Sequence, residues 1–514
     1  MSRSALVKGT IVLTVASLIS KFLGSIFRIP LQNIAGDEVL GIFTLVYPIY
    51  MVALILSVAG IPVAISKLIA RERVHQNQAN IQAIHQTAKI LTLFFGLFSF
   101  VLIFVLSHPI AYLLGGSSVR LSLIVVSATL LIAPYMAVYR GYFQGFGSMK
   151  PTAISQVIEQ FLRVGLILAI AYIFTIQGYS KDVVAGYMMI GSVAGAFASL
   201  SYLQGKYRKQ KSVRVSRYNF STFRIWSRKI LKLSLPIAIG SITMALLNFV
   251  DSLTIPQSLK AFGIQTEEEV YYIYGIYGRG LTLVQIATVF AASAVLPLIP
   301  ALTEKIEQRD VQGAKDIIKQ TFDSTQLISW PAAVGLFALT MPLNIALFSN
   351  GEGSSVLALL HFSSIFISLT ILGTGILQGL NLANLAALFI VGGVVAKAVL
   401  NILFIPHLGL YGAALSTFFV YLLLFSLNTI FIRKNIPFPF FTKEVWKVII
   451  SSLIMGTMVG APTLFLTFAE WGRFFSLLYV MLAALIGAAI YFFLLYRWKV
   501  LDKKRFSTWL SKMK

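Results

Sequence analysis

Long apolar stretches separated by short polar segments dominate the chain. A helix needs about 20 mostly apolar residues to cross a bilayer, and windows of that length recur along the sequence. Their centres lie near residues 19, 52, 97, 130, 165, 193, 243, 287, 334, 366, 395, 420, 457 and 485. The pattern predicts an all-α, polytopic membrane protein with about fourteen transmembrane helices.

Composition supports this class of protein and excludes others. Hydrophobic residues make up 57% of the 514 residues and charged residues only 12%, so there is no large soluble domain. The chain has no cysteine, which excludes a disulfide framework and a thiolate metal site. Its five histidines match no metal-ligand spacing. Without a P-loop, an H-E-x-x-H motif or a nucleophile elbow, we expect no enzyme activity, no cofactor and no metal.

The net charge of +24 reflects membrane orientation. With fourteen helices threaded alternately, 33 of the 42 Lys and Arg residues fall in segments on one side of the membrane. The other side carries only Arg120, Lys181, Lys260 and Arg473. Basic residues concentrate in cytoplasmic loops, so this bias predicts a plasma-membrane protein with both termini in the cytoplasm. Membrane lipids are then its surroundings, and no nucleic-acid partner is expected.

The sequence also repeats itself at nearly one spacing. An offset of 234 in the numbering matches Gly141 with Gly375, Gln144-Gly145 with Gln378-Gly379, and Arg163 with Lys397. An offset of 235 brings Pro62 onto Pro297. Each copy would hold an even number of spans, so the copies have parallel topology and the substrate path is expected between them.

This repeat predicts how the chain is organised. We expect a six-helix lobe at residues 1–205, a basic cytoplasmic linker at 206–232 and a second six-helix lobe at 233–435. Residues 436–514 then form two extra transmembrane helices and a basic cytoplasmic tail.

Seven charged residues fall inside the apolar windows. The cations are Lys21, Arg28, Arg163, Arg279 and Lys397, and the anions are Glu159 and Asp251. Each charge at the centre of a span costs roughly 2.5 to 3.5 kcal/mol on insertion scales. The five cations exceed the two anions by three charges. A positive interior of this kind favours an anionic ligand, and phosphate is the leading candidate.

Two pairs of these residues have helical spacing. Lys21 and Arg28 are seven residues apart, so they share one face of a continuous helix. They either form a ladder of cations for the ligand, or Arg28 extends to the outer headgroups. Glu159 and Arg163 are four residues apart and are expected to bond each other, which serves a structural role as readily as a functional one.

The remaining charges lie in the second half of the repeat or next to it. Asp251 and the pair Lys397 and Asn401 are predicted to form a polar cluster, either a buried ion pair or a coupling site for a proton or sodium ion. Arg279 follows a run of tyrosines. It either binds a phosphate in bidentate fashion or lies within an interfacial aromatic belt.

Three segments of the sequence resemble a known family. They are Ser20–Gly24 (SKFLG), Gly60–Lys67 (GIPVAISK) and Tyr139–Gly145 (YRGYFQG), the last continuing through Met149–Ala153 and Gln156–Gln160. They resemble the multidrug/oligosaccharidyl-lipid/polysaccharide (MOP) exporter superfamily. The most similar branch is the polysaccharide biosynthesis and stage V sporulation protein B group, relatives of the lipid II flippase MurJ.

The resemblance implies two lobes around a cationic cavity that exports an undecaprenyl-pyrophosphate-linked saccharide by alternating access. The peptidoglycan precursor lipid II or a related cell-envelope glycan is the expected cargo, and cell-envelope synthesis proteins are the expected protein partners. By this resemblance Lys21, Arg28 and Arg279 match essential cavity cations. Asp251, Lys397 and Asn401 match positions that can form a sodium site in the family. Here the Lys397 ammonium would take the ion's place.

Two other functions fit the composition less well. A cation-coupled multidrug antiporter of the same superfamily needs a carboxylate-lined pocket, which two acids against five bases do not provide. An integral glycosyltransferase or polymerase acting on the same lipid needs an acid–base constellation, and none is evident in the sequence.

The topology can be tested with single cysteines, because the chain has none. A cysteine at Ser212, in the basic linker, should react with an impermeant thiol reagent only after the cells are permeabilised. A cysteine at Ser354, in a predicted external loop, should react in intact cells. Labelling at Ser212 in intact cells would contradict the predicted orientation.

Overall fold

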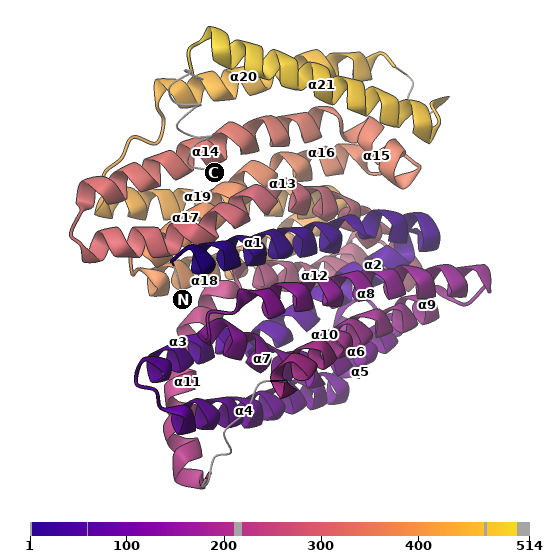
Figure 1. Ribbon diagram of the computed structural model, residues 1–514. Coiled ribbons are helices and arrows are strands. Elements are labelled where there is room, and N and C mark those ends of the chain that lie inside the picture. The colour runs from indigo at the N-terminus through magenta and orange to yellow at the C-terminus, as the bar shows by residue number, and fades with distance from the viewer. Residues whose placement is uncertain (1–2, 59, 210–217, 467–469, 501–514) are drawn as a thin grey trace. The chain divides into compact units, whose positions relative to one another are not determined.

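The structure is a computed structural model that describes residues 3–500, except 59, 210–217 and 467–469. These residues form helices joined by short turns and contain no strand, as the apolar pattern predicts (Figure 1). Among them, 11 helices are long and apolar enough to cross a membrane, or 12 with the bent pair Val311–Ala338 and Thr340–Phe348. Every predicted centre except that near residue 243 falls in one of these segments.

The exception has a structural reason. The apolar window around residue 243 is divided between two helices, because α11 (Phe220–Ser241) ends and α12 (Thr243–Phe262) begins there. In addition, the first turns of α11 are strongly basic, and α12 contains Asp251 and Lys260. The exact count of fourteen spans therefore stays a prediction.

The chain forms two compact units, Met1–Gly275 and Ile276–Lys514. The first unit contains α1 (Arg3–Ile26), α2 (Arg28–Val58), α3 (Ile61–Val74), α4 (Gln78–Val105), α5 (Ser107–Leu113), α6 (Arg120–Ser127), α7 (Ala133–Gly145), α8 (Met149–Ile176), α9 (Lys181–Met188), α10 (Ile190–Arg208), α11, α12 and the first turns of α13 (Glu267–Glu307). Short 3-10 helices, η1 (Ser117–Val119) and η2 (Ala128–Leu131), flank α6.

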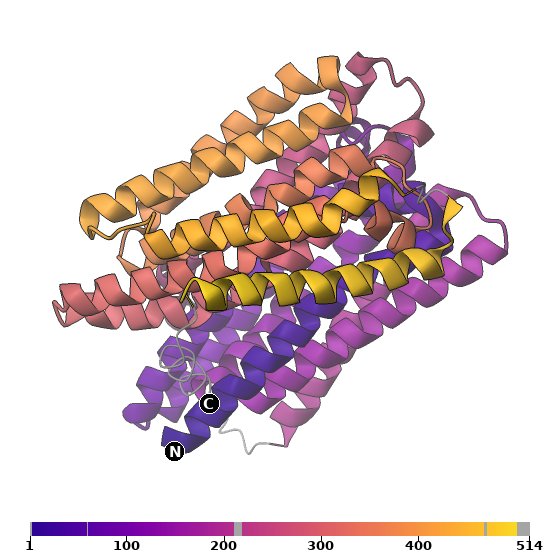
Figure 2. The same cartoon turned by 90° about the horizontal axis from the view of Figure 1, so that it is seen from above.

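The second unit contains the rest of α13 and the remaining helices. They are α14 (Val311–Ala338), α15 (Thr340–Phe348), α16 (Ser354–Phe362), α17 (Ser364–Gly379), α18 (Ala383–Leu408), α19 (Leu410–Asn435), α20 (Lys443–Gly460), the 3-10 helix η3 (Ala461–Leu464) and α21 (Arg473–Arg497). The last two long helices, α20 and α21, run side by side and pack on α14 and α15 (Figures 1 and 2).

The two units divide the chain differently from the predicted lobes. Helix α11 packs on α3 and α4, and α12 packs on α2, so both belong with the N-terminal helices. The division consequently falls inside α13. The predicted lobe boundaries and linker stay predictions, and part of that linker, 210–217, as well as the end of the basic tail, 501–514, lies outside the described residues.

The predicted repeat is visible in the helix boundaries. The offset that matches Gly141 with Gly375 also matches, to within one position, the starts of α4 and α14, α5 and α15, α6 and α16, and α8 and α18. The caps correspond as well. The Asn77 side chain accepts from the N–H of Asn80 at the start of α4, and the Asp310 side chain accepts from that of Gly313 at the start of α14. Hydrogen bonds from Lys305 and Gly313 lower the pKa of Asp310.

Close helix packing recurs at the repeated glycines. A Cβ added to Gly141 of α7 would lie 2.7 Å from the carbonyl oxygen of Pro62 in α3. In the second unit, a Cβ on Gly375 of α17 would lie 2.6 Å from Cγ1 of Val295 in α13. In each unit the glycine-bearing helix therefore packs against the helix that contains the repeated proline. This shared contact supports a duplicated origin of the two halves.

Two glycines of the first unit bring the backbones of α2 and α13 into direct contact. A Cβ on Gly41 would lie 1.9 Å from the carbonyl oxygen of Tyr271, and one on Gly275 would lie 2.0 Å from that of Asp37. Only glycine allows the two backbones to approach this closely.

Gly41→Ala should therefore destabilise the protein, because the backbone of α13 must shift to admit the methyl group. We expect a loss of about 1–3 kcal/mol, measured as a lower melting temperature of the detergent-solubilised protein. The matched control is Gly165→Ala in α8, where the added Cβ meets nothing within 4 Å. Equal melting temperatures for the two variants would contradict the close packing of α2 and α13.

Candidate functional site

Two arginines of the first unit share one aromatic ring. Arg28 is the first residue of α2, and Arg163 lies in the middle of α8. The Cζ of Arg163 lies 5.1 Å from the ring centroid of Tyr47, and that of Arg28 lies 5.9 Å from the same centroid. Arg28 also lies over Phe43, at 5.4 Å. The arrangement brings two of the predicted site residues together.

The aromatic rings compensate these cations only in part. Phe43 and Tyr47 are stacked, with centroids 5.2 Å apart, and present their faces to the guanidinium groups. Arg28 is buried and Arg163 half-buried, and the Nε atoms of both are buried without a hydrogen-bond partner among the described residues. The two cations also repel each other. Unused donors on neighbouring guanidinium groups favour the binding of an anion.

Glu159 does not bond Arg163, contrary to the prediction from their spacing. Its Oε2 instead accepts from Nη2 of Arg140 in α7, at 2.6 Å. Glu159 attracts Arg163 only at longer range. Arg140 is not among the predicted site residues, because the threading of the helices places it with the cytoplasmic cations. The available signal was its position inside the Tyr139–Gly145 segment.

Glycines of α10 hold the Glu159–Arg163 turn of α8 in place. A Cβ on Gly195 would lie 2.6 Å from the carbonyl oxygen of Glu159, and one on Gly191 would lie 2.8 Å from that of Arg163. The two helices therefore touch along their backbones at this turn, which fixes the positions of both charged residues.

Lys21 lies on a different helix from Arg28. Helix α1 ends at Ile26 and α2 begins at Arg28, so the single helix predicted for the two cations is interrupted at Phe27. Lys21 is exposed, unlike Arg28. Helix α1 packs on α8 next to the Glu159 turn, since a Cβ on Gly24 would lie 2.9 Å from Nε2 of Gln160.

In the second unit, Arg279 of α13 is fully buried. Its Nη1 donates to Oδ1 of Asn344 at 3.1 Å and to Oδ1 of Asn350 at 2.7 Å. Its guanidinium also lies 5.4 Å from the ring centroid of Phe348. Arg279 therefore connects α13 to the end of α15 and the turn that follows.

Lys397 and Asn401 are both buried on α18. The Lys397 ammonium donates to Oγ1 of Thr417 in α19, and that hydroxyl also lies 2.9 Å from the Tyr277 hydroxyl. Asp251 is buried in α12 of the first unit, where it interacts with Tyr274. Since Asp251 and Lys397 belong to different units, their predicted pairing stays a prediction.

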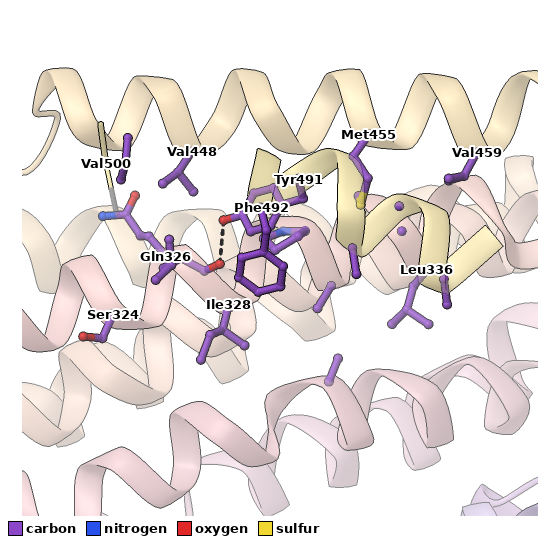
Figure 3. A pocket seen from close by; sticks show the side chains of 18 of the residues that line it. Ser324, Gln326, Ile328, Leu336, Val448, Met455, Val459, Tyr491, Phe492 and Val500 are labelled. Carbon is purple, nitrogen blue, oxygen red and sulfur yellow. Dashed lines mark hydrogen bonds between the residues drawn. The ribbon is translucent and has the colours of Figure 1, made fainter. Parts of the chain in front are cut away.

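An apolar cavity of about 1630 Å³ lies between α14, α15, α20 and α21 in the second unit (Figure 3). Leu336, Met455 and Val459 line its apolar part. Polar side chains gather toward the N-terminal half of α14. Near the middle of that helix, Nε2 of the buried Gln326 has no hydrogen-bond partner among the described residues. No group of His, Asp and Glu that could hold a metal ion occurs in the described part of the chain. The cavity can accept a long apolar chain.

The matching family model and the most similar curated proteins point to the same family. Residues 6–306 match the family described as polysaccharide biosynthesis protein. The chain is 30% identical to the membrane protein YabM of Bacillus subtilis, over 95% of this chain and 92% of that protein. It is 26% identical to the lipid II flippase MurJ of the same organism, over 97% of this chain and 96% of that protein. Stage V sporulation protein B of that organism is also 26% identical, over 98% and 97%.

Solved structures show the same fold. Lipid II flippase MurJ in an inward closed conformation has a TM-score of 0.62, 16% identity, and coverage of 94% of this chain and 99% of that chain. An inward-facing multidrug resistance MATE transporter of the MOP superfamily has a TM-score of 0.62, 17% identity, and coverage of 83% and 98%. At these identities the likeness describes the fold alone.

Arg279→Ala should lower the melting temperature of the detergent-solubilised protein. It leaves the buried Asn344 oxygen without this donor, at a cost of about 1–3 kcal/mol for such a group, and opens a cavity. Arg433→Ala, which removes an exposed cation at the end of α19, is the control and should leave the melting temperature unchanged. If both variants melt alike, Arg279 does not stabilise the connection between α13 and α15.

Proposed function

Because the chain belongs to the polysaccharide biosynthesis protein family of the MOP superfamily, we propose that it flips a lipid-linked saccharide. The proteins that it resembles include a lipid II flippase and multidrug transporters, and the chain is a multi-pass membrane protein. Our proposal for the cargo is an undecaprenyl-pyrophosphate-linked saccharide, with lipid II as the first candidate. We also propose that the protein lies in the plasma membrane with both termini in the cytoplasm.

The observation that carries this proposal is the Arg28–Arg163 pair on Tyr47. A diphosphate offers several charged oxygens, and two guanidinium groups with unused Nε donors can bind them with charge-assisted hydrogen bonds. A cationic drug would be repelled by the same pair. The site therefore favours an anionic head group over the substrates of multidrug antiporters.

The apolar cavity supports the lipid part of the cargo. A long prenyl chain needs an apolar surface within the bilayer, and α14, α15, α20 and α21 provide one of about 1630 Å³. The polar side chains toward the start of α14 would lie nearer the membrane surface. The similarity to MurJ of Bacillus subtilis, a lipid II flippase, is consistent with such a cargo.

The other predicted site residues have roles in this proposal. Lys21, exposed on α1, would meet the head group at the entrance, and Arg279 and Lys397 would turn from partners within the protein to phosphate oxygens during transport. Outward movement of negative charge from a negative interior gains roughly 2.3 kcal/mol per charge for each 100 mV. The membrane potential can therefore drive export. Asp251 and Asn401 remain our candidates for ion coupling.

Arg28→Gln and Arg163→Gln should each slow transport by about tenfold to a hundredfold, the factor expected when a charge-assisted hydrogen bond to the substrate is lost. The measurement uses proteoliposomes that contain a fluorescent lipid II analogue. The fraction of the analogue that an impermeant quencher reaches is followed over time.

The control is Lys305→Gln, which breaks an exposed ion pair with Asp310 and should transport at the wild-type rate. Wild-type rates for both arginine variants would exclude this pair as the substrate site. If the wild-type protein does not move the analogue, lipid II is not the cargo. Rescue of a strain depleted of its lipid II flippase provides the corresponding test in cells.

A further inference from the structure

We propose that Arg140 is a positioning residue that binds Glu159 and so leaves the charge of Arg163 available to the anionic substrate. The inference rests on the proposed function, because it concerns the same arginine pair. It assigns a role to the Arg140–Glu159 ion pair, which joins α7 to α8 beside the Arg28–Arg163 pair.

Arg140 is held by acceptors on two other helices. Its Nε donates to Oγ of Ser155 at 3.0 Å, and its Nη2 donates to Glu159 at 2.6 Å and to Oγ of Ser199 at 3.1 Å. The Ser155 hydroxyl gives its own hydrogen to the carbonyl oxygen of Thr152, at 2.7 Å, so it serves Arg140 as an acceptor. The guanidinium is thereby oriented with Nη2 toward the Glu159 carboxylate.

Without Arg140, Glu159 has a second cation within reach. Arg163 follows it by one helical turn, and a glutamate four residues before an arginine is a favourable pair on a helix. The glycine contacts with α10 hold this turn of α8. The backbone at Glu159 therefore cannot shift to carry the carboxylate away from Arg163. The ion pair is only partly exposed, with side-chain exposures of 15% for Arg140 and 23% for Glu159. The competition between the two arginines for Glu159 therefore takes place with little screening by water.

The outcome of that competition decides the charge of the substrate site. When Arg140 holds Glu159, the two charges cancel, and Arg28 and Arg163 keep theirs on the Tyr47 ring. If Glu159 instead bonded Arg163, the site would lose one of its two positive charges. A carboxylate would then also stand beside the expected position of the phosphates and repel them.

The internal repeat supports this interpretation. At the offset that matches Arg163 with Lys397, Glu159 corresponds to Gly393 and Arg140 corresponds to Thr374. The second copy has a cation at this position, Lys397, but neither member of the ion pair. Where no carboxylate precedes the cation by one turn, no arginine is present to bind it.

The test compares Arg140→Leu with the double variant Arg140→Leu/Glu159→Gln in the proteoliposome assay. The single variant should lose transport by about tenfold to a hundredfold, since Glu159 turns to Arg163. The double variant lacks that carboxylate and should recover toward the rate of Glu159→Gln alone. The control Ser199→Ala removes one bond to Arg140, leaves the ion pair intact and should transport like the wild type.

The melting temperature of each variant separates positioning from a structural role, because losing one partner of a partly buried ion pair leaves an uncompensated charge that itself destabilises the protein. If the ion pair served only to hold α7 against α8, the loss and recovery of transport would follow the melting temperature, and the folded variants would bind farnesyl diphosphate like the wild type. Equal rates for the single and double variants, or a fully active Arg140→Leu, would overturn the proposal. A second readout is calorimetric binding of farnesyl diphosphate to the detergent-solubilised variants, which should weaken and recover in the same order.

The two proposals fail in different ways. A wild-type protein that neither moves the lipid II analogue nor binds farnesyl diphosphate contradicts the proposed function. A wild-type protein that does both, and loses both on Arg163→Gln, while the double variant stays as impaired as Arg140→Leu, contradicts the role of Arg140 alone.

Discussion

The cost of removing a charge from water governs how the buried cations of this protein are arranged. The described residues compensate them in different ways. Arg140 is paired with a carboxylate, Arg279 with asparagine oxygens, and Lys397 with a threonine hydroxyl. Arg28 and Arg163 lie over aromatic faces, Arg163 also hydrogen-bonds the Tyr47 side chain, and the Nε donors of both arginines are unused among the described residues. Neither arginine is bonded to a carboxylate or an amide among the described contacts, and an anionic substrate is the partner that we propose for them.

Close helix packing makes this arrangement possible. Because lipid tails are as apolar as leucine, helices in a membrane associate through small residues that let backbones touch. Gly41 and Gly275 bring α2 against α13, whereas Gly191 and Gly195 bring α10 against the α8 turn that carries Glu159 and Arg163. Arg28 and Tyr47 belong to the helix fixed by the first contact, and Arg163 belongs to the one fixed by the second. The relative positions of Arg28, Tyr47 and Arg163 therefore depend on these glycine contacts.

The sequence predicted the elements of the fold better than the contacts of the site. Apolar windows located the long helices, and the offset of the repeat anticipated the matching starts of α8 and α18. Predictions of side-chain partners from residue spacing were wrong where a residue of another helix binds the same group. Glu159 and Arg163 have the spacing of a pair, yet Arg140 from α7 takes the carboxylate. Likewise, Lys21 and Arg28 have the spacing of one helical face, but the helix is interrupted at Phe27 between them. Spacing describes one helix, and the partner of a buried charge depends on the neighbouring ones.

The two halves of the repeat share a cation at one position, but the side chains that surround it differ. In the first half, Arg163 lies over Tyr47, with an arginine–glutamate pair one turn away. In the second half, the repeat places Leu281 or Thr282 at the position of Tyr47, and Thr374 and Gly393 replace the ion pair. Lys397 there donates to a hydroxyl. A lysine ammonium on its flexible stem can turn to different acceptors, whereas two planar guanidinium groups on one ring offer a fixed set of donors. Under the proposed function, the first half therefore carries a preorganised anion site, and the second half carries a cation that can turn to different acceptors.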